Sequence, residues 1–300
     1  MYGKYIELIS QKGIPYKENV SLSKYSSFEI GGPAAIAVFP ENTEDIVFCV
    51  KSAKAFGIRN KIIGNGSNIL FSDKGFDGVI IFTTHAKNIE VNKNTVTAEC
   101  GASFTYLASV ACKSSLSGLE FAYGIPGTVG GAVFMNAGAY GGEVSDVLVS
   151  SLCYDSESGN IYTLDKQSHK FDYRTGIYDQ NEALVVLSAT FELQEKNAEE
   201  IKSLMEDLMA KRRDKQPLEF PSAGSTFKRP EGHFAGKLIE DAGLKGYTVG
   251  GAQVSKKHAG FVINRGGATA ADVLGLIEHI KNTVYASFGV MLECEIKYID

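Results

Sequence analysis

Two stretches of small residues, sixty positions apart, carry residue types that could hold a phosphate group. The first, Gly64 to Asn68 (GNGSN), follows an apolar run, and its short side chains would let consecutive main-chain N–H groups turn toward an anion. It is not a Rossmann fingerprint, because Ile69 stands where the third glycine should be, and the chain has no Walker motif. Taken alone, this stretch is explained equally well as an ordinary tight turn.

The second stretch runs from Gly124 to Gly131 and continues into the segment NAGAYG at 136–141. Pro126 stiffens a loop whose flanking glycines lack Cβ atoms, and Thr128 could cap a short helix whose N-terminus would favour a diphosphate. A close crossing of a helix over a sheet is the alternative. One dinucleotide that touches both glycine loops explains them better than two unrelated turns.

Three further positions carry side chains that could take part in chemistry. Arg174, beside Tyr173, carries a fork of donors that could hold a carboxylate or enolate, although a lone arginine is more often a surface ion pair. Ser225 lies in the small-residue turn PSAGSTF, where its hydroxyl could pass a proton to a carbanion or simply cap a helix. The chain has no G-x-S-x-G elbow, which disfavours a hydrolase nucleophile.

The third position lies in the C-terminal segment LECEIKY, which alternates as a strand does. The residues expected on its buried face are Leu292, Cys294, Ile296 and Tyr298. Glu293 and Glu295 share the other face with Lys297. Spacing does not choose between the two glutamates, and a solvated strand face is the alternative reading of both.

The elements that must position these residues alternate between strands and helices, which indicates an α/β fold. Strands are predicted at 35–39, 61–63, 79–82, 94–99, 147–154, 160–164, 183–193, 260–264 and 291–299. Helices are predicted from Thr43 as cap to Gly57, from Ser103 as cap to 115, and at 197–213, 235–242 and 270–288. The helix at 197–213 should bury one face made of Ile201, Leu204, Met205 and Leu208. A domain boundary is expected near 195–215.

Composition excludes several classes of protein. The net charge of −5 and the absence of a long basic run disfavour nucleic-acid binding. No apolar run is long enough to span a membrane, and no signal peptide is expected. The five cysteines are scattered and never spaced C-x-x-C, which predicts reduced, mostly buried thiols in a cytoplasmic protein and no metal site.

Taken in order, these motifs closely resemble the family of UDP-N-acetylenolpyruvoylglucosamine reductase. The likeness runs from about Leu22 to Tyr298. The matching pieces are GNGSNILFSD, GIPGTVGGAVFMNAGAYG, YR, AGSTFKRP, AGKLIEDAGLKG, VSKKHAGFVIN and LECEIKYI. The resemblance implies an FAD-binding domain of the vanillyl-alcohol-oxidase (PCMH) type at 1–195, with subdomains at about 1–85 and 86–195. An α/β substrate-binding domain follows at 196–300, and its last strand could return to the first domain.

The resemblance also implies the reaction: NADPH reduces the flavin and leaves, and flavin N5 then delivers hydride to the methylene carbon of the enolpyruvyl group on a UDP-sugar. Arg174 and Glu295 would stabilise the resulting enolate, and Ser225 would donate the proton. Substrate contacts are implied at Tyr173, Lys215 and Lys228. The implied FAD-binding residues are Gly64, Asn65, Gly66, Ser67, Asn68, Gly124, Ile125, Pro126, Gly127, Thr128, Gly130 and Gly131.

The resemblance leaves other features as expectations. The short interval from Arg174 to Lys215 is typical of the family's shorter type, which lacks a tyrosine-bearing loop. No His or Cys in the glycine motifs is placed to link the flavin, so FAD should be noncovalent, and a monomer is favoured slightly. His258 and Asn264 could serve packing or substrate contact. The rival functions are a flavin-dependent alcohol or sugar oxidase of the same fold and a non-catalytic nucleotide-binding module.

Overall fold

The computed structural model describes residues 2–300, and they form two compact units, each with its own core. The first unit takes the N-terminal segment up to Glu18, Ala35–Asn65 and Gly78–Lys211, and the second takes Asn19–Ala34, Gly66–Asp77 and Arg212–Asp300. The expected division at 195/196 into two continuous segments therefore differs from the observed one. The reason is burial: Phe28, Ile30 and Leu70, from the N-terminal quarter of the chain, pack with Ile239 and Leu276 in the second core.

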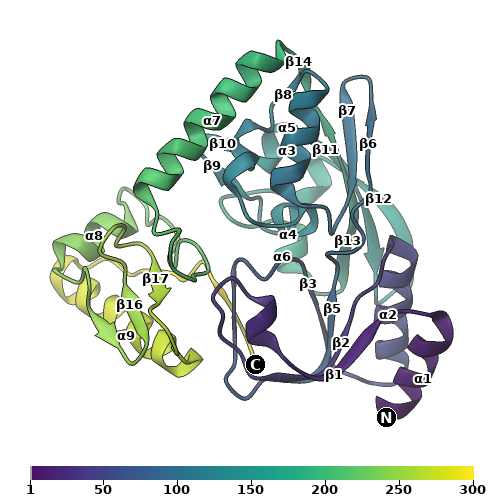
Figure 1. Cartoon of the computed structure of the whole chain (residues 1–300), viewed down its shortest axis with the longest axis horizontal. Helices are drawn as coiled ribbons and strands as arrows, with labels where there is room; N and C mark the ends of the chain where they lie inside the picture. Colours follow the sequence, from purple (N-terminus) through teal and green to yellow (C-terminus); the bar gives the residue numbers. More distant parts are fainter. Residues whose placement is uncertain (1) are drawn as a thin grey trace. The chain divides into compact units, whose positions relative to one another are not determined.

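The first unit contains two sheets. One has the order β1-β2-β5-β3, and its strands are β1 (Tyr16–Ser21), β2 (Pro33–Val38), β3 (Asn60–Ile63) and β5 (Phe76–Phe82). The other is antiparallel, has the order β12-β11-β13-β7-β6 and forms a continuous ladder (Figure 1). Its strands are β6 (Ile89–Asn92), β7 (Thr95–Glu99), β11 (Leu148–Asp155), β12 (Ile161–Asp165) and β13 (Leu184–Glu192).

Helices of the first unit start where the sequence offers a cap. Ser103 accepts a hydrogen bond from the Tyr106 N–H at the start of α3 (Phe104–Lys113), as predicted. At α2 (Thr43–Ala55) the cap is Asn42, not Thr43, because the Asn42 side chain accepts from the Asp45 N–H. The remaining elements are α1 (Tyr2–Lys12), β8 (Leu116–Ser117), η2 (Glu120–Gly124), α4 (Val129–Phe134), β9 (Gly138–Ala139), β10 (Gly142–Glu143), α5 (Val144–Val147), η3 (Gln167–His169), α6 (Ile177–Gln180) and β14 (Gln194–Glu195).

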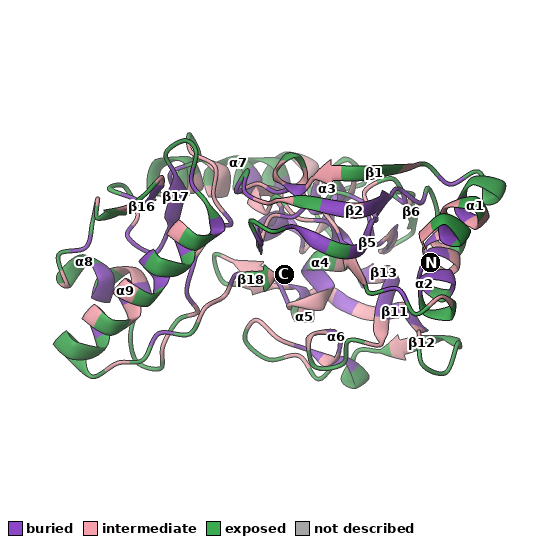
Figure 2. Cartoon of the chain, turned by 90° about the horizontal axis from the view of Figure 1, so that it is seen from below, coloured by how far each residue is buried: buried purple, intermediate pink, exposed green. Residues whose placement is uncertain are grey.

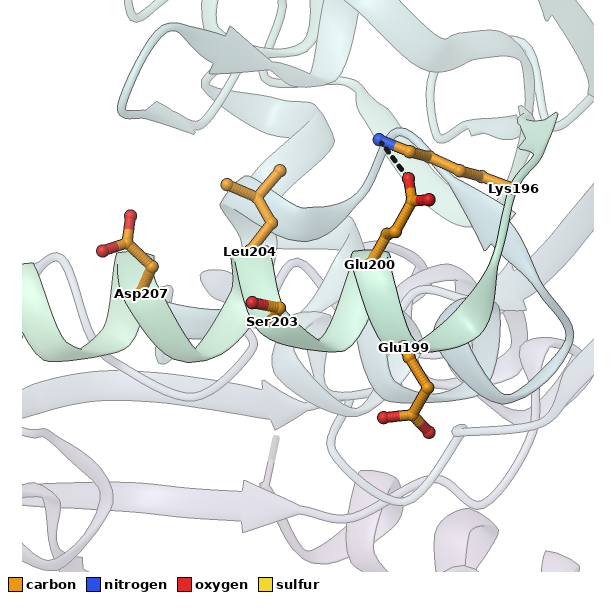
Figure 3. Close-up of a pocket in the computed structure, with 6 residues that line it drawn as sticks. All are labelled: Lys196, Glu199, Glu200, Ser203, Leu204 and Asp207. Carbon is orange, nitrogen blue, oxygen red and sulfur yellow. Dashed lines mark ion pairs between the residues drawn. The ribbon is translucent and has the colours of Figure 1, made fainter.

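The helix α7 (Ala198–Lys215) buries less of its surface than its pattern predicts. Ile201 and Met205 are buried in the first core, but Leu204 is 42% exposed, so the expected four-residue apolar face is wrong at that position. Figure 3 shows Leu204 in a shallow surface hollow of α7, together with an ion pair of 3.6 Å between Lys196 and Glu200. No residue predicted for the functional site lines this hollow.

The second unit is small and is built around α9 (Ala270–Phe288), whose bounds match the prediction. Its buried residues recur every three or four positions, so the ribbon of α9 alternates between buried and exposed colours in Figure 2. The unit also contains η1 (Leu22–Tyr25), β4 (Ile69–Phe71), α8 (Ala235–Asp241), the antiparallel sheet β15-β16-β17 (Thr248–Val249, Ala252–Val254, Val262–Asn264) and β18 (Lys297–Ile299).

The C-terminal segment is a strand only at its end. β18 pairs in parallel with β4, so the last strand returns to a segment from the first 85 residues. The predicted strand over 291–299 is too long, since 291–296 joins its neighbour through a single bridge at Cys294. Tyr298, expected on the buried face, is 43% exposed. Among the helices described, none is long and apolar enough to cross a membrane.

Candidate functional site

The two glycine motifs lie against each other in the first unit. A Cβ atom on Gly64 would come within 2.2 Å of the Thr128 Oγ1, so only glycine allows the two loops to approach this closely. The Asn65 side-chain amide donates a 2.7 Å hydrogen bond to the Pro126 carbonyl oxygen. Two loops sixty residues apart in the chain therefore form one continuous main-chain surface.

The expected role of the helix N-terminus needs correction. Thr128 does cap α4, accepting from the Gly131 N–H at 3.3 Å, as predicted. However, the N–H groups of Val129 and Gly130 already donate to the carbonyls of Ala102 and Cys100, at 2.8 and 2.7 Å. A Cβ atom on Gly130 would lie 2.8 Å from the Cys100 Cβ, so this glycine permits close packing of the helix. The first turn of α4 has no spare donor for a diphosphate at these positions.

Main-chain donors remain in the loops that precede the helix. Within residues 2–300, nothing accepts a hydrogen bond from the N–H groups of Asn65, Gly127 or Thr128. The same holds, across the described chain, for the N–H groups of Gly66 and Ser67 in the second unit. Runs of unpaired main-chain N–H groups are the feature that nests for anions share. The donors thus lie in the loops and not at the helix end.

Arg174 occupies the tip of a tight hairpin in the first unit. Asp172 and Thr175 exchange main-chain hydrogen bonds of 3.1 and 3.2 Å, which leaves Tyr173 and Arg174 as the turn. The Arg174 Nη2 donates to the Gly138 carbonyl oxygen at 2.7 Å, and Nη1 donates to the Asn136 carbonyl oxygen at 3.4 Å. Its guanidinium carbon also lies 5.1 Å from the centre of the Tyr173 ring. Two main-chain carbonyls of the segment 136–138 therefore help to fix the direction of this guanidinium group.

A buried polar cluster lies at the base of this hairpin. The Ser151 hydroxyl is 2.8 Å from the His169 Nε2 and 2.6 Å from the Tyr178 hydroxyl, and the His169 Nδ1 is 2.7 Å from the Asp165 carbonyl oxygen. The Phe171 ring stacks on His169 at 4.9 Å. Burial lowers the pKa of His169, so the cluster holds a neutral imidazole.

This neutral histidine predicts a fold that loses stability in acid. Because the unfolded chain takes up the proton first, the free energy of unfolding is retained above about pH 6.5 and falls below it, by at most about 1.4 kcal/mol per pH unit for one histidine. Burial lowers the pKa of His258 as well, which adds a change of the same sign. We expect His169→Gln to flatten, but not abolish, the pH dependence of the melting temperature between about pH 8 and pH 5.5.

His233→Gln is the matched control, since His233 is exposed and its replacement should leave the slope unchanged. A slope for His169→Gln equal to that of the unmodified chain would contradict the prediction.

Ser225 and Glu295 lie on neighbouring segments of the second unit. The Glu295 N–H donates to the Thr226 carbonyl oxygen and the Lys228 N–H to the Glu293 carbonyl oxygen, each at 2.9 Å. Ser225 caps no helix, is half-buried, and its hydroxyl has no hydrogen-bond partner among the described residues. Its surroundings therefore do not fit the structural alternative of a capping serine.

The structure separates the two glutamates that spacing left equivalent. The Glu293 carboxylate is 73% exposed and pairs with the Lys228 Nζ at 2.5 Å. Glu295 is half-buried, and its carbonyl oxygen accepts from the side chain of Asn68, a predicted cofactor residue, at 3.1 Å. The Asn68 carbonyl oxygen accepts from the Lys297 N–H at 3.0 Å. Glu295 is thus fixed beside a glycine motif, whereas Glu293 faces solvent.

The other predicted residues divide into exposed and structural ones. Lys215 ends α7 and is exposed, and Tyr173 is 43% exposed. Asn264 is fully used within the fold, since its amide donates to the Phe28 carbonyl oxygen and accepts from the N–H groups of Gly266 and Ala268. His258 packs edge-on against Phe261, and its Nδ1 accepts from the Gly260 N–H. Both His258 and Asn264 therefore have packing roles.

No individual role was predicted for the residues of the segment NAGAYG at 136–141. The structure shows that Asn136 and Gly138 hold Arg174. The available signal was an asparagine followed by two glycines, which is typical of a tight turn, but its partner lies 36 to 38 residues away in the chain. The described residues contain no group of three or more His, Cys, Asp or Glu side chains that could hold a metal ion.

Comparison with known proteins gives consistent results along the chain. An FAD binding domain family matches residues 34–165, and the C-terminal domain of UDP-N-acetylenolpyruvoylglucosamine reductase matches 216–299. The reductase of Clostridioides difficile is 50% identical over 100% of this chain and 97% of its own length, and that of Caldicellulosiruptor saccharolyticus is 48% identical over 97% and 94%.

Comparison with solved structures indicates the same family. The reductase from Thermus caldophilus superposes with a TM-score of 0.81 at 31% identity, over 96% of this chain and 99% of that one. Glucooligosaccharide oxidase from Acremonium strictum, at 13% identity, 93% and 58% coverage and a TM-score of 0.52, shares the fold alone. These findings confirm the predicted α/β fold with an FAD-binding part.

Proposed function

Because this chain belongs to the UDP-N-acetylenolpyruvoylglucosamine reductase family, we propose that it reduces UDP-N-acetylglucosamine enolpyruvate to UDP-N-acetylmuramate with electrons from NADPH. The chain is an oxidoreductase with an FAD-binding domain. The observation that carries the proposal is near-complete coverage of relatives at about half identity, together with the matched glycine loops. The proposed setting is peptidoglycan precursor synthesis in the cytoplasm, where the product serves the cell wall, cell shape and cell division.

The residues of the first unit fit the cofactor. The adjoining loops at Gly64–Asn65 and Gly124–Thr128 offer a bare main-chain surface with unpaired N–H groups, which suits a diphosphate. Gly66, Ser67 and Asn68, which continue the first loop along the chain, are proposed to bind the cofactor as well, whereas Gly130 and Gly131 would support the loop. Bound FAD, held noncovalently, would take a hydride from NADPH and supply it to the methylene carbon of the enolpyruvyl group.

The protein's own residues would manage the charge that this transfer creates. Hydride addition to the methylene carbon breaks the C=C π bond and leaves an electron pair on the carbon that carries the ether oxygen and the carboxylate. Arg174 would stabilise the enolate form of this electron pair with a positive charge that is already in place. Ser225 would protonate the carbon and later recover a proton from solvent, so the sum consumes NADPH and one proton and yields NADP⁺ and the lactyl ether.

Glu295 would assist at the enolate, either protonated or by orienting a neighbour. Tyr173, Lys215 and Lys228 would contact the UDP-sugar, and Lys228 would then have to exchange its contact with Glu293 for one with substrate. The short interval between Arg174 and Lys215, filled mainly by β13 and α7, supports the shorter family type.

Anaerobic mixing of the purified flavoprotein with NADPH tests the function. We expect rapid bleaching of the flavin, followed by reoxidation when the enolpyruvyl UDP-sugar is added. A flavin that NADPH leaves oxidised, but that alcohols or sugars reduce and O₂ reoxidises, would support the rival oxidase. Colourless protein that takes up no FAD would support a binding module.

The two glutamates give an internal comparison. We expect Glu295→Gln to lower kcat for the enolpyruvyl substrate by at least about tenfold more than Glu293→Gln, because Glu293 pairs with Lys228 at the surface. Steady-state turnover of both variants with NADPH measures this difference. An equal loss, or a larger loss in Glu293→Gln, would show that the wrong glutamate has been assigned.

A further inference from the structure

We infer that Asn136 is a positioning residue that aims Arg174, and that the segment from Asn136 to Glu143 is a cradle for the guanidinium group. This inference rests on the proposed role of Arg174.

Every polar group of Asn136 takes part in a hydrogen bond, and these bonds connect three segments of the chain. It is fully buried, its side-chain oxygen accepts from the Ser145 N–H in α5 at 2.9 Å, and its side-chain nitrogen donates to the Asp172 carbonyl oxygen at 3.2 Å. Its main-chain oxygen accepts from the Arg174 Nη1. One residue thus bonds both to the hairpin that carries Arg174 and to the tip of its side chain.

Only asparagine meets these requirements together. The position has a φ of 47°, in the left-handed region that asparagine tolerates better than most residues. The asparagine amide carries its donor and its acceptor on separate atoms, so it can bond to the Asp172 carbonyl oxygen and the Ser145 N–H at once. Aspartate would set a carboxylate against the Asp172 carbonyl oxygen, and alanine would leave the half-buried Ser145 N–H without its acceptor.

The rest of the cradle is rigid. β9 and β10 form a two-residue hairpin whose turn residues, Tyr140 and Gly141, both have positive φ, the geometry that matches the twist of paired strands. A Cβ atom on Gly138 would lie 2.6 Å from the Gly142 carbonyl oxygen, so the tight hairpin requires glycine where the second guanidinium bond is accepted. α4 and α6, which flank this segment, lie together in Figure 1.

The effect of the arginine depends on where its guanidinium group lies. Two carbonyl oxygens of the cradle accept from its Nη atoms, so the group is directed before the enolate develops. Since a misplacement of about 1 Å can cost about 100-fold in rate, loss of the Asn136 bridge should matter although its side chain touches no reacting atom.

A double-mutant cycle on the flavin-loaded enzyme tests the inference. We expect Asn136→Gly, which accommodates the positive φ and retains the carbonyl, to slow reoxidation of the reduced flavin by the enolpyruvyl UDP-sugar about 10–100-fold. In an Arg174→Ala background the same change should cost less than about threefold, because the residue acts through the arginine. A full, additive loss in that background would overturn the inference.

Two further measurements separate positioning from general damage. Asn136→Asp preserves the shape and the acceptor for the Ser145 N–H, so it tests loss of the donor to Asp172 if the glycine variant folds poorly. Asn181→Gly removes another side-chain acceptor of a loop N–H in the same unit, at Ala183, and should leave reoxidation within about twofold of the parent.

Rescue of reoxidation by millimolar guanidinium ion is a measurement that a purely structural role of Asn136 would not change. The ion should partly restore reoxidation in Arg174→Ala, where the cradle is intact, and should fail in Arg174→Ala with Asn136→Gly. Equal rescue in both would overturn the inference. If Arg174→Ala alone reoxidises at the parental rate, the proposed role of the arginine is wrong. If Arg174→Ala slows reoxidation but Asn136→Gly does not, only the positioning role of Asn136 is wrong.

Discussion

Replacing Ser225 with alanine is expected to slow reduction of the enolpyruvyl substrate by about 10²–10⁴-fold while NADPH still reduces the flavin at close to its usual rate. The hydroxyl is half-buried and has no partner among residues 2–300, so its loss should leave no protein group unsatisfied. Stopped-flow absorbance of the flavin measures the two half-reactions separately. The loss should therefore appear only in the half-reaction in which substrate reoxidises the flavin.

Two further variants serve as comparisons for Ser225→Ala. Ser225→Cys retains a proton donor of comparable size, so it should lose less than the alanine variant. Ser222→Ala removes a hydroxyl three residues earlier in the same segment and should have little effect on either half-reaction. Equal slowing of both half-reactions in Ser225→Ala would show that Ser225 supports the structure and does not supply the proton.

Arg174→Ala is expected to slow the same step by about 10²–10³-fold, the usual cost of removing one preorganised group that stabilises developing negative charge. The reason lies in its surroundings: the Asn136 and Gly138 carbonyls accept from the guanidinium group and so direct its positive charge. Arg174→Lys should recover only part of the loss, since an ammonium group retains the charge but lacks the planar fork that meets both carbonyls.

The control for charge alone is Lys170→Gln, which removes an exposed cation four residues away in the same segment. It should change reoxidation by less than about twofold, because exposed charges are strongly screened. If Lys170→Gln and Arg174→Ala slow the reaction alike, the arginine contributes only to the general field. The geometric role described above would then be wrong.

Features that depend on neighbouring residues in the chain could be predicted from the sequence. The start of α9 follows from its capping box at Thr269 and Asp272, and its end follows from Gly289 in the left-handed region. The helix cap at Thr128 and the glycine requirement of both loops are also local, because a missing Cβ is a property of the residue itself. The family resemblance rests on the same ordered motifs, and the comparisons confirm it.

Assignments that depend on distant partners could not be predicted in this way. The expected domain boundary differs from the observed one because Phe28 and Leu70 bury their side chains in a core formed mostly by residues beyond 212. The pattern of α7 predicted a buried Leu204, but whether an apolar side chain is covered depends on which element lies opposite it, and Leu204 is exposed.

The sequence by itself determined the family, the fold class and the motifs that carry the chemistry, because those are recorded as residue types in a fixed order. Only the tertiary structure decided which donors are free and which groups are fixed. The carbonyls of Ala102 and Cys100 accept from the first N–H groups of α4, the exposed Glu293 carboxylate pairs with Lys228, and the carbonyls of Asn136 and Gly138 accept from Arg174. The physical reason is that a hydrogen bond requires two partners within about 3 Å, and in each of these cases the chain separates those partners by many residues.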